Sequence, residues 1–154
     1  MEVSNEAYSE VSNRLFFRLF QSANLLHKKG TAAVEEYGVT TQQWSVLGVF
    51  YRNQVIEEGG ISVGDLSEHL LVSRQSLTGT LDLMLNKKYI KKVTNPRDKR
   101  SKLIQITPKG RTLWSNLQLP ITEFYQSALE GISFDDQTSI LHYLNKIISN
   151  MEAM

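Results

Sequence analysis

Basic residues gather in one short stretch of this sequence. Ten of the 17 Lys and Arg residues lie between positions 87 and 111, where Asp98 is the only acidic residue. The remainder carries seven basic and fifteen acidic residues, so the net charge of +1 conceals a strong separation of charge. Such separation suits a protein that presents one face to a polyanion, such as the phosphates of a nucleic acid. A solvated basic surface is the alternative, and the surrounding structural element decides between them.

That element is predicted to be a β-hairpin. Residues 89–94 and 102–107 have the β-branched and aromatic composition of strands, and residues 95–100, Asn-Pro-Arg-Asp-Lys-Arg, are typical of a turn. The tip of such a hairpin is narrow enough to enter or flank the minor groove of DNA, where an arginine senses groove width and negative potential. The hairpin therefore favours DNA binding over a plain charged surface.

Five residues of the hairpin are predicted to contact DNA. We expect Arg100 to enter the minor groove, with its guanidinium oriented by Asp98. Arg97 and Lys99 are expected on phosphates, and Lys102 belongs to the same basic set. The alternative for Arg100 and Asp98 is a surface ion pair worth about 0–1 kcal/mol.

Two short helices are predicted just before the hairpin. Ser62 is the expected N-cap of the first and Ser73 that of the second, which runs from residue 74 to about residue 87. Only Leu71 and Val72 separate them, as a helix–turn–helix requires. Together with the hairpin, these elements make a winged helix–turn–helix, whose second helix fits the major groove.

The second helix has an apolar stripe and a polar face. Leu77, Leu81 and Met84 recur at helical spacing and are expected in the core. The polar side and the capped end are expected to contact bases and phosphates, the alternative being plain exposure to solvent. The predicted DNA-binding residues here are Ser73, Arg74, Gln75, Ser76 and Thr78.

Amphipathic helices are expected on both sides of this region. Residues 10–29 form the first, and a second follows a capping box of Thr40 and Gln43, leading into a polar loop at residues 53–60. A helix beginning at Thr107-Pro108, kinked at Pro120, extends to about residue 129.

A final helix is expected from the Ser133 cap to about residue 151. The aromatic run at residues 15–20 and the C-terminal stripe Ile140, Leu144, Ile147 and Met151 favour a core or a dimer interface over a ligand site.

Four stretches together resemble the MarR family of bacterial regulators. They are residues 39–47 (VTTQQWSVL), 66–73 (LSEHLLVS), 95–101 (NPRDKRS) and 103–110 (LIQITPKG). The resemblance implies a mainly α-helical fold with a small β-hairpin wing, and a homodimer on a pseudo-palindromic site in double-stranded DNA. Residues 40–107 would form the winged helix–turn–helix region, and residues 8–37 and 108–152 the helical dimerisation region.

Two positions depart from the family pattern. Gly79 stands where many relatives carry Arg on the recognition helix, so a DNA contact would be lost or moved to Arg74. Lys88 stands where relatives often have the glycine that ends this helix, so a different helix end is expected.

The resemblance also implies a small-molecule pocket between the dimerisation helices and the winged region. The basic and aromatic residues of the first helix suggest an anionic, aromatic effector that releases a repressor from DNA. The stretch 13–28 also resembles relatives that respond to aromatic acids or their coenzyme A thioesters. For His27, beside Lys28 and Lys29, a solvated surface cluster is the slightly preferred alternative. The candidate ligand-binding residues are Arg14, Arg18, His27, Gln43 and Trp44.

Several function classes are disfavoured by composition. The sequence has no cysteine, so disulfides, thiolate metal sites and thiol redox switches are excluded. The three His residues lack metal-ligand spacing and no catalytic or nucleotide-binding motif appears, so we expect no enzyme, no metal and no cofactor. No membrane span or secretory signal is evident, and we expect a cytoplasmic protein. A winged helix used for protein docking or DNA architecture, without a specific operator, remains the rival function.

Overall fold

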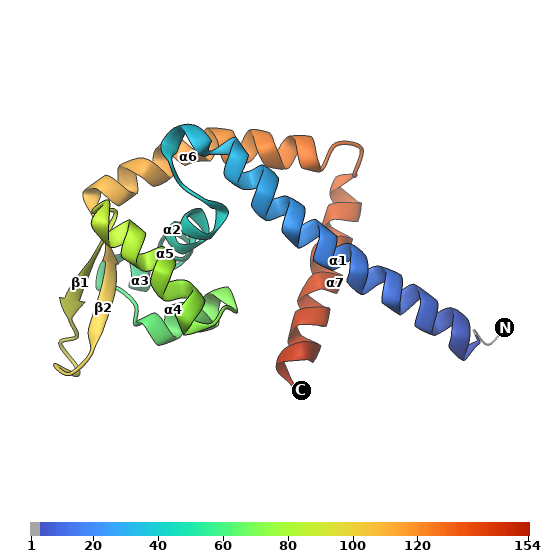
Figure 1. Cartoon of the computed structure of the whole chain (residues 1–154), viewed down its shortest axis with the longest axis horizontal. Helices are drawn as coiled ribbons and strands as arrows, with labels where there is room; N and C mark the ends of the chain where they lie inside the picture. Colours follow the sequence, from blue (N-terminus) through green and yellow to red (C-terminus); the bar gives the residue numbers. More distant parts are fainter. Residues whose placement is uncertain (1–3) are drawn as a thin grey trace. The chain divides into compact units, whose positions relative to one another are not determined.

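The computed structural model describes residues 4–154, which form mostly α-helices and one two-stranded antiparallel sheet, as predicted (Figure 1). The chain divides into two compact units, Met1–Ile121 and Thr122–Met154. No helix among the described residues is long and apolar enough to cross a membrane.

The first unit begins with α1 (Asn5–Ala33), which is longer than the predicted helix. Ser4 caps it, its hydroxyl oxygen accepting the Ala7 N–H at 3.2 Å. The 3-10 helix η1 (Glu35–Tyr37) follows and ends at Gly38, whose φ of 64° is the left-handed conformation that glycine adopts without strain. This turn directs the chain into α2.

The capping box predicted at the start of α2 (Thr41–Arg52) is confirmed. The Thr40 hydroxyl accepts the Gln43 N–H at 3.3 Å, and the Gln43 side-chain oxygen accepts the Thr40 N–H at 3.0 Å. Most of α2 is buried, so this helix forms the centre of the core in the first unit.

The polar loop expected at residues 53–60 is wrong, because a short helix, α3 (Gln54–Gly59), occupies it. The Asn53 side-chain oxygen accepts the N–H groups of Val55 and Ile56, so it caps a new helix where α2 ends. Ile56 is buried and attaches α3 to the core.

The helix–turn–helix consists of α4 (Val63–Leu70) and α5 (Arg74–Asn86). Both predicted caps are confirmed: the Ser62 hydroxyl accepts the Asp65 N–H and the Ser73 hydroxyl accepts the Ser76 N–H, each at 3.1 Å. Leu71 turns the chain between the helices with a left-handed φ of 54°.

The wing consists of β1 (Ile90–Thr94) and β2 (Lys102–Ile106), paired antiparallel with Ile90 opposite Ile106. Ile61 forms an isolated antiparallel bridge with Ile104 of β2, since its N–H and carbonyl both bond Ile104. Helix α6 (Pro108–Ala128) follows directly, capped by Thr107, and continues through Pro120.

A dense apolar core joins these elements. The residues with almost no exposed surface include Leu47, Phe50, Leu66, Met84, Ile104 and Leu117. They come from α2, α4, α5, β2 and α6, so the core fixes α5 relative to the wing.

The second unit contains the end of α6 and α7 (Phe134–Glu152), capped by Ser133 as predicted. No residue of α7 is buried, and Phe134 is 80% exposed. Most apolar side chains on this helix, among them Phe134, Ile140 and Leu141, are therefore exposed within the single chain.

Candidate nucleic-acid interface and the cavity beside it

The recognition helix α5 buries one face and presents the other. Leu77, Leu81 and Met84 are buried, whereas Gln75 and Thr78 are exposed. The Thr78 hydroxyl donates to the Arg74 carbonyl at 2.8 Å, which leaves its oxygen free to accept. The predicted division of the helix into core and polar faces is therefore confirmed.

Other predicted contact residues lie at the start of α5. Ser73 uses its hydroxyl as the helix cap, and the Arg74 guanidinium lies against Gly64 of α4, where a larger residue would displace the arginine side chain. Ser76 also faces the cavity described below. The capped end of α5 remains a place where free N–H groups and the helix dipole favour a phosphate.

The tip of the wing is held by its own polar side chains. The Asn95 side chain accepts the Arg97 N–H at 3.0 Å and donates to the Ser101 hydroxyl at 3.1 Å. Asp98 accepts both the side-chain Nε and the backbone N–H of Arg100, each at 3.1 Å. These contacts set the direction of the Arg100 guanidinium while the side chain stays 92% exposed.

Arg100 also changes the protonation of Asp98. The hydrogen bond from the Arg100 side chain, and then that from its N–H, lower the pKa of Asp98 below its ordinary value. The carboxylate therefore stays ionised at neutral pH, and its bond to Arg100 is lost only when the pH falls through that lowered pKa.

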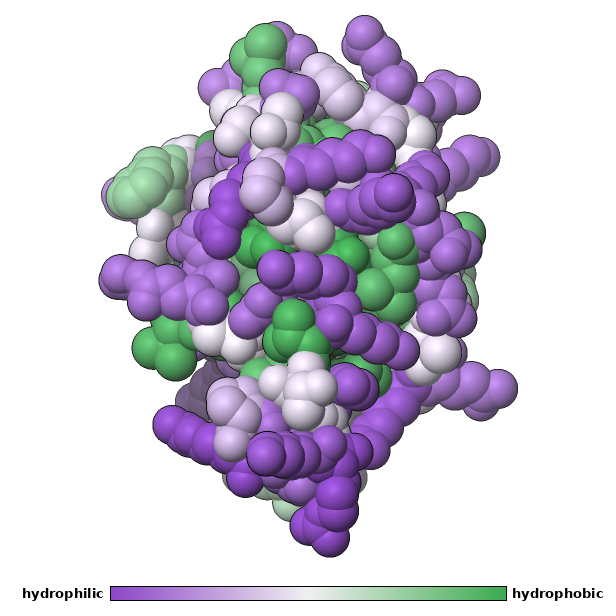
Figure 2. Space-filling model, turned by 90° about the vertical axis from the view of Figure 1, so that its left-hand side faces the viewer, coloured by the Kyte–Doolittle hydropathy of each residue, from purple (hydrophilic) through white to green (hydrophobic). Residues whose placement is uncertain are grey.

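Three basic side chains of the stretch 87–111 bond groups of the protein outside the hairpin. Lys87 donates to the Gly38 carbonyl at 2.7 Å, Lys109 donates to the Lys87 carbonyl at 2.8 Å, and Arg111 pairs with Glu57. The side chains that project into solvent concentrate on the hairpin, where Lys91, Lys92, Arg97, Lys99 and Lys102 are exposed. Figure 2 shows hydrophilic side chains over most of the face that carries the hairpin.

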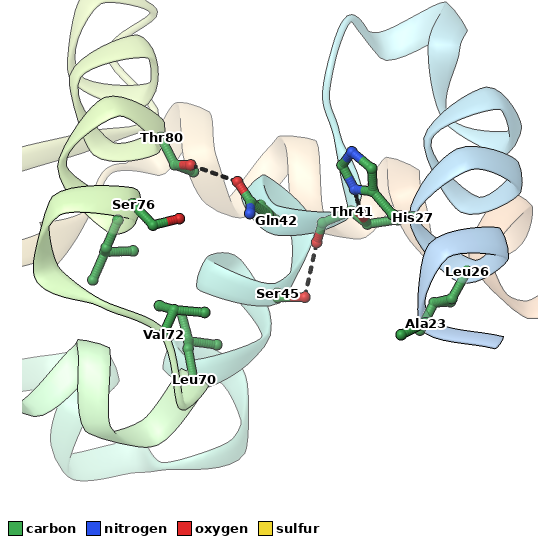
Figure 3. A pocket seen from close by; sticks show the side chains of 11 residues that line it. Ala23, Leu26, His27, Thr41, Gln42, Ser45, Leu70, Val72, Ser76 and Thr80 are labelled. Atoms are coloured by element: carbon green, nitrogen blue, oxygen red, sulfur yellow. Dashed lines mark hydrogen bonds between the residues drawn. The ribbon is translucent and has the colours of Figure 1, made fainter. Parts of the chain in front are cut away.

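A cavity of about 450 Å³ lies behind the recognition helix (Figure 3). One side is formed by α1 and α2, which contribute Ala23, Leu26, His27, Thr41, Gln42 and Ser45. The other side is formed by the helix–turn–helix, which contributes Leu70, Val72, Ser76, Leu77 and Thr80. Its size and mostly apolar lining are those of a small-molecule site.

Two hydrogen bonds join elements that line this cavity. The Thr80 hydroxyl of α5 donates to the Gln42 side-chain oxygen of α2 at 2.9 Å. His27 Nδ1 of α1 lies 2.7 Å from the Thr41 hydroxyl. The ring of His27 is therefore engaged with α2, unlike the freely solvated cluster preferred from sequence.

The structure does not bring the other expected ligand-binding residues to this cavity. Arg14 and Arg18 are exposed along α1, where Arg14 lies 3.9 Å from Glu10 and Arg18 donates to Gln21. Gln43 is buried in its capping box, and Trp44 is buried in the core. Of the five candidates, only His27 lines the cavity.

The comparisons with known proteins agree with this architecture. A sequence model of the MarR family matches residues 37–101. The "Transcriptional activatory protein BadR" of Rhodopseudomonas palustris is 48% identical over 150 residues, which cover 97% of this chain and 85% of BadR. The chain belongs to the MarR family. It is accordingly a transcriptional regulator of the MarR type.

Solved MarR-type structures show the same fold. The MepR–DNA complex of S. aureus matches with a TM-score of 0.72 at 22% identity, covering 96% of this chain and 99% of MepR. CouR of Rhodococcus jostii RHA1, bound to p-coumaroyl-CoA, matches with a TM-score of 0.75 at 19% identity, covering 88% of this chain and 92% of CouR.

At Lys88, this MarR-family chain keeps the helix end that glycine usually makes. Lys88 has a left-handed φ of 62°; its N–H bonds the Leu85 carbonyl, and the Tyr89 N–H bonds the Met84 carbonyl. These are the two bonds of a Schellman motif. The different helix end expected from sequence is therefore wrong, since lysine adopts the glycine conformation.

Gly79, the other departure from the MarR pattern, lies on the exposed side of α5. A Cβ built there meets nothing within 4 Å. The glycine therefore leaves open space on the side of α5 that bears Gln75 and Thr78.

Proposed function

We propose that this chain is a homodimer that binds a specific site in double-stranded DNA in the cytoplasm, under the control of a small molecule bound in the cavity. The observation that carries the proposal is the arrangement of α5, whose exposed face is free for DNA while its other face lines the cavity.

For DNA contact, the proposal assigns different tasks to helix and wing. Gln75 and Thr78 have hydrogen-bonding groups suited to base edges in the major groove. Arg100, directed by Asp98, is placed in the minor groove, while Arg97, Lys99 and Lys102 neutralise phosphates. Ser73, Arg74 and Ser76 complete the set near the capped end of α5.

Homodimer formation is supported by the uncovered helices. Buried residues on α1 are limited to Gly30, whereas Phe16, Phe17 and Phe20 are each at least half exposed. Together with the bare apolar side chains of α7, they offer more apolar surface than a monomer ordinarily leaves in water. Two recognition helices about 34–36 Å apart would then read two half-sites.

Control by a small molecule is supported by the cavity and by CouR, which was solved with p-coumaroyl-CoA. A ligand changes DNA affinity only if it binds one placement of the recognition helices better than another. His27 belongs to this site, whereas Arg14, Arg18, Gln43 and Trp44 lie elsewhere in this structure.

The sign of regulation follows from where the DNA site lies. Repression is the expectation from sequence, yet BadR, at 48% identity, is named an activatory protein. Binding controlled by a ligand serves either outcome, because the same complex blocks a promoter or recruits polymerase according to its position. The chemistry proposed is binding, with no catalytic step.

The test is fluorescence anisotropy with a duplex from upstream of the protein's own gene, at several salt concentrations and against random competitor DNA. We expect competitor-resistant binding that weakens steeply with log[salt], because phosphates are neutralised. Binding that random DNA abolishes would favour an architectural protein, and no binding at low salt would favour a protein-docking winged helix.

A further inference from the structure

The cavity lining carries no side chain of Lys, Arg, Asp or Glu. Its polar groups are hydroxyls, one amide and the imidazole of His27. A carboxylate placed here would lose water without gaining a permanently charged partner, which is costly in an apolar setting. The lining therefore disfavours the free-acid effector that the sequence left open.

Most polar groups of the cavity already have partners within the protein. The Thr41 hydroxyl is bonded to His27, the Ser45 hydroxyl donates to the Thr41 carbonyl at 2.8 Å, and the Thr80 hydroxyl donates to the Gln42 oxygen. The Gln42 oxygen faces Thr80, so its amide nitrogen points away from Thr80 (Figure 3). The structure records no bond from this nitrogen to any of residues 4–154. This nitrogen is therefore an unused donor of the lining, beside the Ser76 hydroxyl and Nε2 of His27, which also have no recorded bond to residues 4–154.

We propose that the cavity takes an uncharged, mainly apolar ligand whose carbonyl oxygen accepts a hydrogen bond from Gln42 Nε2. The ligand class is an ester, thioester, amide or ketone rather than a free acid. This inference rests on the proposed function, in which the cavity is the effector site.

The same amide connects the ligand to DNA binding. Gln42 belongs to α2, and Thr80 belongs to the recognition helix, so their bond joins elements 38 residues apart. A ligand that accepts a hydrogen bond from Gln42 Nε2 contacts the same amide group whose oxygen accepts the bond from Thr80 of α5. Ser76, Leu77 and Thr80 place the ligand against α5 itself. Gln42 and Thr80 are thus positioning residues for the recognition helix.

The test uses two fluorescent probes that differ in charge and by one methyl group: 6-(dimethylamino)-2-naphthoic acid and its methyl ester. With the full chain and no DNA, the ester should bind saturably and at least about tenfold more tightly than the acid. Gln42→Leu should weaken ester binding about 3–10-fold, the effect of one net hydrogen bond.

A matched pair of variants locates the probe. Ala23→Phe fills the cavity and should abolish ester binding, whereas Ala32→Phe, at an exposed α1 position outside the lining, should leave it intact. Equal or tighter binding of the acid, ester binding that survives Ala23→Phe, or no saturable binding would each overturn the ligand class. None of these outcomes involves DNA, so a failure here is separate from a failure of the regulator.

The coupling is tested by adding the operator duplex. Ester at saturation should change the Kd for DNA at least about fivefold, and Thr80→Val, which removes the hydroxyl but keeps the shape, should bring this ratio close to one. An unchanged ratio in Thr80→Val would show that the Gln42–Thr80 bond does not transmit occupancy.

Discussion

The winged helix–turn–helix and the terminal helices of this chain differ in how completely they bury their apolar residues. In the first, Phe50, Leu66 and Ile104 are fully buried. In the second, α7 buries nothing, and α1 buries only Gly30. The winged region thus has a complete apolar core. The terminal helices carry apolar side chains that remain exposed in the single chain. The difference supports the proposed homodimer, in which the winged helix–turn–helix of each chain has its own core and the terminal helices of two chains pair.

The largest expected effect concerns the finished core. Phe50→Ala should lower the free energy of unfolding by about 3–5 kcal/mol, because it leaves a cavity among fully packed neighbours. Urea denaturation followed by circular dichroism measures this. Phe134→Ala, at an 80% exposed position, is the control and should cost far less under conditions where the chain is monomeric. Similar decreases in the free energy of unfolding for both variants would contradict the difference in burial between the two regions.

The next effect concerns the uncovered helices. Phe20→Asp should raise the Kd for self-association at least about 30-fold, since a charge at an apolar contact removes a hot spot worth about 2 kcal/mol or more. Sedimentation velocity over a range of concentrations measures it. Val55→Asp, at a 78% exposed apolar position of α3, is the matched control and should leave self-association unchanged. If both variants dissociate the protein equally, α1 is not the interface.

A smaller effect is expected at the wing. Arg100→Ala should weaken operator binding by about 1–3 kcal/mol and reduce the salt dependence if the guanidinium lies in the minor groove. Lys146→Ala, which removes the same charge from α7, should have little effect. Anisotropy titrations compare them, and equal affinities for the two variants would remove Arg100 from the interface.

The smallest effect concerns a helix end. Lys88→Gly should stabilise the protein by about 1 kcal/mol, because lysine is strained at a left-handed φ that suits glycine. Asn86→Gly, within the last turn of α5, should destabilise it by about 0.5–1 kcal/mol. A loss of stability in Lys88→Gly would mean that the lysine side chain makes contacts that outweigh its backbone strain.

The sequence predicted the elements that rest on local signals. Thr40, Ser62, Ser73 and Ser133 each cap the expected helix, because a cap bonds N–H groups only two or three residues away. Helix α3 was missed although Asn53 caps it in the same way. Its polar, glycine-ended sequence resembles a loop, and only the burial of Ile56 distinguishes it.

The cavity could not be predicted in the same way. Its lining joins α1, α2 and α5, and the Gln42–Thr80 bond links positions 38 residues apart without any motif. Arg14 and Arg18 were predicted as ligand contacts because of their charge, yet both lie on the exposed face of α1, where charged side chains are common. Gln43 and Trp44 looked like polar ligand contacts, but a cap and the core use their side chains.

The most direct test of the account is the stoichiometry of the complex with DNA. Sedimentation equilibrium with the operator duplex should give two chains per duplex, and Phe20→Asp should lose the two-chain complex while keeping a folded winged region. One wild-type chain per duplex, bound with undiminished affinity and specificity, would contradict the claim that the uncovered helices pair two winged helix–turn–helix regions on one DNA site.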